Sequence, residues 1–191
     1  AVRWAACGGE RSPVGGPGGV AGGGGRCKPK GYGRNRNWDV VDPMKMPEIT
    51  AQRNPVKQWL QSGHSIDLYL SLHNTETSEY LEGPPEDGGH GKFHPLAERL
   101  FRALSEHTSF APTRPLFYSE TTTTPGKQGR MVVIQGLYRD FQLPGFLMEQ
   151  RVSYNDKIGH LPEIPDRLKF GGELVKAMAE AGIPVGVMVA P

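Results

Sequence analysis

The sequence predicts a single α/β domain, because strand-like and helix-like patterns alternate along the chain and no segment repeats. Residues 66–73 alternate between apolar and polar side chains, as a half-buried strand does, and residues 145–150 form a second strand-like run. Residues 95–107 and 165–182 carry apolar side chains at helical spacing. The 191 residues are enough for one domain of ordinary size.

The N-terminal segment differs in composition from the rest. Residues 1–33 hold 12 of the 26 glycines, so ordering them would cost too much backbone entropy. We therefore expect a poorly ordered arm over residues 1–33 and the domain over residues 34–191. Cys7 and Cys27 lie in this arm, either as a disulfide or as two free thiols, and they leave the cellular compartment open.

The first helix of the domain is expected to open with Asn54 as N-cap and Pro55 at the first helical position, and to end at Gly63. In the strand over residues 66–73, the polar face ends in His73. Its apolar face carries Ile66, Leu68, Leu70 and Leu72.

The middle and the end of the chain complete the alternation. Pro95 begins the helix that ends near His107. Two further strands are expected over residues 114–119 and 131–135, with a polar loop over residues 121–129 between them. The strand over residues 145–150 delivers Glu149, and residues 185–189 are expected to form a last edge strand.

Charge and hydropathy exclude two function classes. The 22 basic and 20 acidic residues nearly cancel, and no basic block of five or more occurs, so nucleic-acid binding is not indicated. No apolar run approaches the ~20 residues that a membrane span needs, and the N-terminus lacks the layout of a signal peptide.

Three polar features occur in an order that has chemical meaning. Asn35-Arg36-Asn37-Trp38-Asp39 precedes the strand that ends in His73, and Glu149 follows near the end of a later strand. A guanidinium binds a carboxylate through two hydrogen bonds, an imidazole holds zinc, and a carboxylate takes a proton from water. Together these groups are what metal-assisted peptide hydrolysis requires.

In this order and wording, the chain resembles the zinc carboxypeptidases related to carboxypeptidase A, from about Gly16 to about Arg151. The resemblance implies a mixed, mainly parallel sheet flanked by helices. It also implies a Zn²⁺ cofactor and a peptide substrate with a free C-terminal carboxylate.

The resemblance assigns roles to six residues. Asn35 and Arg36 would clamp the substrate carboxylate, His73 would be the third zinc ligand, and Glu149 would be the general base. Arg26 would hold the oxyanion. Tyr138 would close over the substrate, and a packing role for it stays open.

The chain departs from this family at the other zinc ligands. The family's His-x-x-Glu motif precedes the Asn-Arg motif, whereas no histidine precedes Asn35 here. A histidine followed three residues later by a glutamate also occurs at residues 73–76 and 160–163, and we interpret both occurrences as coincidence. We therefore expect an incomplete domain that lacks its N-terminal part. The alternatives are a non-catalytic carboxylate- or peptide-binding remnant and a zinc deacylase of similar fold.

Overall fold

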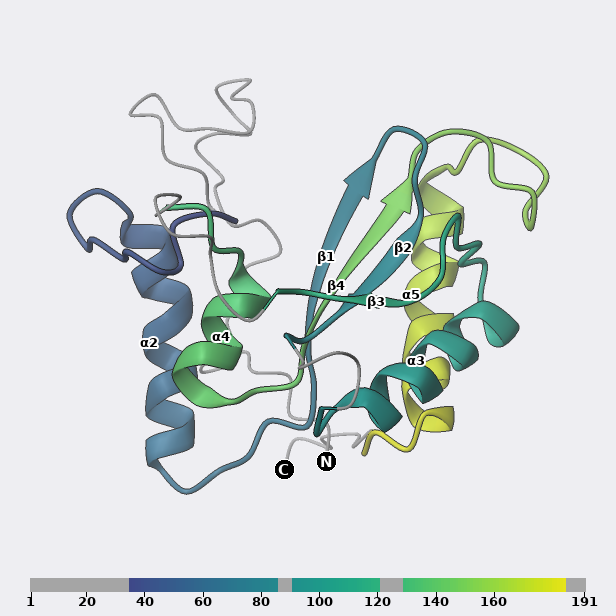
Figure 1. The fold of residues 1–191 in the computed structure, drawn as a ribbon. Helices are drawn as coiled ribbons and strands as arrows, with labels where there is room; N and C mark the ends of the chain where they lie inside the picture. The colour runs from purple at the N-terminus through teal and green to yellow at the C-terminus, as the bar shows by residue number, and fades with distance from the viewer. Residues whose placement is uncertain (1–34, 86–90, 121–128, 185–191) are drawn as a thin grey trace, which may run out of the picture.

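A four-stranded sheet forms the centre of the computed structural model, which describes residues 35–85, 91–120 and 129–184. The strands are β1 (Tyr69–Thr75), β2 (Tyr80–Gly83), β3 (Phe117–Tyr118) and β4 (Gly145–Arg151), and their order is β1-β4-β2-β3 (Figure 1). β1 pairs with β4 and β2 with β3 in parallel, whereas β2 and β4 are antiparallel. The predicted α/β class with a mixed, mainly parallel sheet is confirmed.

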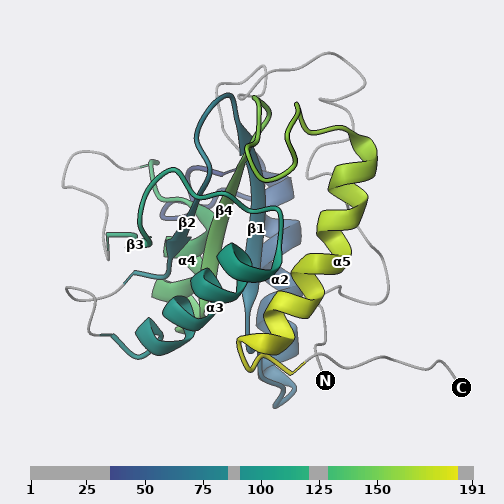
Figure 2. The same cartoon turned by 90° about the vertical axis from the view of Figure 1, so that its right-hand side faces the viewer.

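Helices cover both faces of this sheet. α2 (Pro47–Gln61) and α4 (Val133–Phe141) lie on one side, and α3 (His94–His107) and α5 (Ile164–Glu180) lie on the other (Figure 1). Figure 2 shows α3 and α5 side by side in front of the strands. None of the helices in the described ranges is long and apolar enough to cross a membrane.

Alternation along the strands divides the buried side chains into two cores. In β4, Phe146 and Met148 face α3 and α5, whereas Leu147 between them faces α2 and α4. In β2, Leu81 joins the first core and Tyr80 packs against the second. Glu149 lies two residues after Leu147 and therefore shares its face, the α2/α4 face. Tyr80 and Glu82 flank Leu81 and therefore lie on the face opposite to it, which is also the α2/α4 face.

Several elements agree with the sequence predictions. The helices predicted over residues 95–107 and 165–182 are α3 and α5, and the strand over residues 145–150 is β4. The strand predicted over residues 66–73 is β1, displaced toward the C-terminus, so His73 lies two residues before its end. The edge strand predicted over residues 185–189 and the arm over residues 1–33 lie outside the described residues, as do Cys7 and Cys27.

The strand predicted over residues 131–135 is wrong, because this segment begins α4. A short apolar run does not distinguish a buried strand from a buried helix. Here Val133, Ile134 and Leu137 are buried at helical spacing. The amide of Val133 also donates to the Asn35 side chain, 2.9 Å away, which satisfies one free donor at the start of the helix.

The predicted start of the first helix is also wrong. α2 begins at Pro47, and Pro55 lies inside it, so Asn54 is not an N-cap. Proline is favourable at Pro47 because the first helical amide has no partner within the helix. The buried residues Ile49 and Val56 lie two turns apart and hold one continuous face against the sheet, which offsets the interior proline.

Two strands differ from the sequence predictions, one in length and the other because it was not predicted. Of the strand predicted over residues 114–119, only Phe117 and Tyr118 pair, and they pair with the end of β2. β2 itself was not predicted, because its four residues are too short for a clear pattern. It is nevertheless the strand that brings new polar groups to the site.

Candidate functional site

Three side chains lie in one row across the sheet. His73 of β1 is directly opposite Glu149 of β4, and Glu149 is directly opposite Tyr80 of β2. Residues opposite one another on neighbouring strands have their Cβ atoms about 5 Å apart and point to the same face. An imidazole, a carboxylate and a phenol are therefore neighbours on the α2/α4 face, and each side chain is only half-buried.

The segment of residues 35–39 is fixed above this face by its tryptophan. Trp38 is 1% exposed and packs against Gly136 of α4, where an added Cβ would lie 2.6 Å from the Trp38 Cβ. Its backbone amide donates to the carbonyl of Met131 at 3.1 Å. Asn37 adopts a left-handed backbone with a φ of 66°, which turns the chain next to Arg36. Trp38 thus anchors the segment, and Asn35 and Arg36 stay half-buried at the site.

Asn35 links this segment to the row. Its Oδ1 accepts the hydrogen bond from the Val133 amide, and this contact fixes the orientation of the side-chain amide. Its Nδ2 lies 3.3 Å from Nε2 of His73, and the Ser71 hydroxyl lies 2.8 Å from the same nitrogen. An amide nitrogen only donates, so Nε2 is the acceptor and the neutral His73 ring carries its proton on Nδ1.

Arg36 brings a positive charge to the same region. Its Nη1 donates to the Asn35 carbonyl at 2.6 Å, which holds the side chain close to the motif. Its charge also acts on Glu82 of β2, two residues after Tyr80 and on the same face. Burial raises the pKa of Glu82, while the Ser119 hydroxyl, which donates a hydrogen bond to Glu82, and the charges of Arg114 and Arg36 act in the opposite direction.

A second guanidinium lies at the β2 end of the row. Arg114 is exposed, and its guanidinium carbon is 3.6 Å from the centre of the Tyr80 ring and 4.1 Å from that of Phe117. Burial and the negative charge of Glu149 raise the pKa of Tyr80. Tyr80, Glu82 and Arg114 were not predicted as site residues. The alternation of polar and apolar side chains over residues 80–82 was the only sequence signal for Tyr80 and Glu82.

Four of the six predicted site residues, Asn35, Arg36, His73 and Glu149, belong to the arrangement described above, whereas Tyr138 makes a different contact. The ring of Tyr138 packs edge-on against Phe93, with ring centres 6.4 Å apart. Arg26 lies outside the described residues. The structure thus brings Asn35, His73 and Glu149 together, with Arg36 next to Asn35.

The described residues by themselves do not fit a zinc centre. Among residues 35–85, 91–120 and 129–184, no group of three His, Cys, Asp or Glu side chains is arranged to hold a metal ion. Zinc sites normally take three or four protein ligands. In addition, the Nε2 lone pair of His73 already accepts from Asn35, so a metal ion at Nε2 would have to displace that contact.

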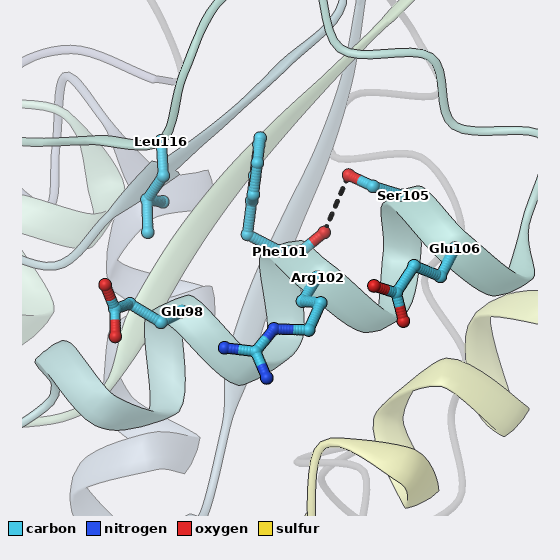
Figure 3. A pocket seen from close by; sticks show the side chains of 6 residues that line it. All are labelled: Glu98, Phe101, Arg102, Ser105, Glu106 and Leu116. Carbon is cyan, nitrogen blue, oxygen red and sulfur yellow. Dashed lines mark hydrogen bonds between the residues drawn. The ribbon is translucent and has the colours of Figure 1, made fainter.

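An open pocket lies away from this face, on the outer side of α3 (Figure 3). Side chains of α3 line it together with one residue that precedes β3, namely Glu98, Phe101, Arg102, Ser105, Glu106 and Leu116. The Ser105 hydroxyl donates to the Phe101 carbonyl at 2.8 Å, as an ordinary helix residue does. The pocket includes none of the predicted site residues.

Comparison with known proteins identifies the fold. No family model and no curated protein sequence match the chain. Several solved structures are similar. Among them are a protein assigned as a carboxypeptidase A from Shewanella denitrificans OS-217 (22% identity, TM-score 0.64), a metallo-carboxypeptidase from Pseudomonas aeruginosa (18%, 0.63) and a metallo-carboxypeptidase from Burkholderia cenocepacia (15%, 0.62).

These matches cover most of this chain and less than half of the solved proteins. The Shewanella match covers 87% of this chain and 44% of the other. The Pseudomonas match covers 86% and 44%, and the Burkholderia match covers 90% and 42%. The chain therefore has part of the metallo-carboxypeptidase fold, as its sequence motifs predicted.

Proposed function

We propose that this chain is part of a metallocarboxypeptidase that hydrolyses the peptide bond next to a free C-terminal carboxylate. The observation that carries the proposal is the placement of His73 beside Glu149 in neighbouring strands, with Asn35 hydrogen-bonded to His73. The Pseudomonas neighbour adds support, because its structure contains (2-guanidinoethylmercapto)succinic acid, a ligand with carboxylate groups.

In this proposal, Arg36 recognises the substrate. A guanidinium can donate two parallel hydrogen bonds to one carboxylate, and such charge-assisted pairs are stronger than neutral ones. Asn35 would assist from the same segment. Its Oδ1 already accepts from α4, so its amide nitrogen is the group that it can offer to a carboxylate.

Glu149 would act as the general base. Its side chain is half-buried, and its Oε2 atom is shielded from solvent, so the carboxylate belongs to the site and does not point freely into solvent. A water molecule activated on this face would lose its proton to Glu149, which would then pass it to the leaving amine.

The proposal assigns zinc as the metal and His73 as one ligand, and it requires the other ligands to come from outside the described residues. A metal ion at this place would lower the pKa of a bound water and polarise the scissile carbonyl.

Binding and hydrolysis test different parts of the proposal. Calorimetry with N-acetyl-Ala-Ala-Phe and its C-terminal amide should show that only the free acid binds well, and Arg36→Met should remove the difference. Arg102→Met, on the outer side of α3, is the matched control and should leave binding unchanged. Equal affinity of the wild type for acid and amide would refute the carboxylate clamp.

Hydrolysis is measured on the protein extended upstream to supply the remaining zinc ligands, which is the wild type of this assay, as phenylalanine released from the same peptide at saturating zinc. Glu149→Gln should abolish release and keep peptide binding, because the amide cannot accept a proton. Full activity of Glu149→Gln would refute its role as base.

A second candidate function is a carboxylate- or peptide-binding module without catalysis. It is favoured by the absence of a three-ligand metal group among the described residues and by the hydrogen bond that occupies Nε2 of His73. If the wild type binds the free acid through Arg36 but releases no phenylalanine with zinc, this second function is correct.

A further inference from the structure

Arg114 has an unusual environment for an exposed arginine. Its guanidinium lies against two aromatic rings, those of Tyr80 and Phe117, at 3.6 and 4.1 Å from their centres. Contact with aromatic faces attracts a cation and restricts the rotamers of its side chain. The guanidinium also hydrogen-bonds the side chain of Tyr80, and because Arg114 is exposed and a guanidinium has five N–H donors, the others can reach a ligand.

The sheet register places Arg114 next to the candidate site. Tyr80 is directly opposite Glu149, and Phe117 is directly opposite Glu82. Glu82 is also the residue on which the charges of both Arg36 and Arg114 act. Both guanidinium groups are therefore near Glu82, Arg36 next to the motif and Arg114 against the rings of Tyr80 in β2 and Phe117 in β3.

We propose that Arg114 determines specificity by binding the side-chain carboxylate of an acidic C-terminal residue, while Arg36 binds the terminal carboxylate. This inference rests on the proposed function, since it takes Arg36 as the terminal clamp. The substrate class is a peptide that ends in aspartate or glutamate.

The charges around Arg114 do not favour a basic residue. Glu82 or Glu149 would attract a lysine or arginine side chain if its charge were uncompensated. Glu82 is instead hydrogen-bonded by Ser119, and the charges of Arg36 and Arg114 balance those of Glu82 and Glu149. The exposed group of these four is Arg114, and a guanidinium edge is suited to a carboxylate.

The test compares peptides that differ by one carboxylate. Calorimetry is performed on the full chain with N-acetyl-Ala-Ala-Glu, N-acetyl-Ala-Ala-Gln and N-acetyl-Ala-Ala-Lys. We expect the glutamate peptide to bind about tenfold more tightly than the glutamine peptide, as one added charge-assisted hydrogen-bonded pair provides. Arg114→Met should remove this preference and leave the affinity for the glutamine peptide unchanged.

Matched variants separate recognition from folding. Arg102→Met removes an exposed arginine on the other side of the sheet and should keep the preference for glutamate. Arg114→Lys keeps the charge without the planar fork and should keep part of the preference. Urea unfolding of each variant confirms that loss of preference is not loss of structure.

The outcomes also separate this inference from the proposed function. Equal binding of the glutamate and glutamine peptides, or tighter binding of the lysine peptide, overturns the role of Arg114 while the Arg36 clamp stands. If the C-terminal amides bind as well as the free acids, the clamp fails and the role of Arg114 fails with it. If none of the peptides binds, both are overturned.

Discussion

A buried carboxylate directly before β2 gives the sharpest quantitative prediction. Glu79 is 1% exposed, and its Oε2 lies 3.4 Å from Nε of Arg151 and 3.4 Å from Nδ2 of Asn155. Arg167 and Lys157 add positive charge. Burial nevertheless dominates and raises the pKa of Glu79 from 4.5 to about 7.

The sign of the effect on stability follows from proton linkage. Between pH 4.5 and pH 7 the folded protein keeps the Glu79 proton and the unfolded chain has lost it, so the free energy of unfolding falls as pH rises. One pKa unit corresponds to 1.4 kcal/mol, so the interval between 4.5 and about 7 corresponds to about 3 kcal/mol. Below pH 4.5 and above pH 7 this contribution is constant.

Glu79→Gln removes the titration and keeps the shape of the side chain. The free energy of unfolding of each protein is measured in urea, and the value for Glu79→Gln is subtracted from that of the wild type. We expect this difference to fall by about 3 kcal/mol between pH 4.5 and pH 7.5. Other titrating groups are common to both proteins and cancel. Glu180→Gln, which changes an exposed residue at the end of α5, should show no such difference.

One result would refute the reasoning about Glu79. If the two stability curves stay parallel across this pH range, folding does not raise the pKa of Glu79, and the ion pair with Arg151 offsets or outweighs the cost of burial.

Three further predictions concern the contacts that Asn35 and Trp38 make, and the first of them includes a contrasting glycine in α5. Gly136→Ala should destabilise the protein by about 1–3 kcal/mol in urea unfolding, because the added Cβ would lie 2.6 Å from the Trp38 Cβ. Gly171→Ala, which meets nothing within 4 Å, should instead stabilise α5 by about 0.5–1 kcal/mol. Nitrogen-15 NMR of the neutral His73 ring should show its proton on Nδ1, and protonated Nε2 would contradict the Asn35 contact. Asn35→Leu should lower the free energy of unfolding by about 1 kcal/mol in the same urea assay, because α4 loses a hydrogen bond at its N-terminus. An unchanged value would contradict the capping role of Asn35.

The elements with long, regular patterns could be predicted from the sequence. α3 and α5 agree with prediction because their apolar residues repeat over several turns and proline marks both starts. β4 agrees because its apolar run is bounded by turn residues. α4 could not be predicted from its own residues, since its first amide is satisfied by Asn35, 98 residues earlier in the chain.

The candidate site was predicted only where one motif carried the information. Asn35, Arg36, His73 and Glu149 come from the motif order. The partners of these residues depend on strand pairing, and no local signal reports that Tyr80 lies opposite Glu149. Arg114 belongs to a segment that is mostly loop, so its position over Tyr80 is set by tertiary packing alone.

Folding explains part of the motif but not all of it. Trp38 fills the core beside Gly136, and Asn35 satisfies the first amide of α4, so both would be retained for stability without any catalysis. His73 and Glu149 belong to neither core, since both side chains are half-buried on the α2/α4 face. A carboxylate with one oxygen shielded from solvent in a sheet costs free energy, and an apolar side chain would pack there at no such cost. The case for chemistry therefore rests on Glu149 more than on the motif, and Glu149→Gln decides it. Because glutamine keeps the shape and polarity of glutamate, a purely structural role would survive the change, whereas a proton acceptor would not.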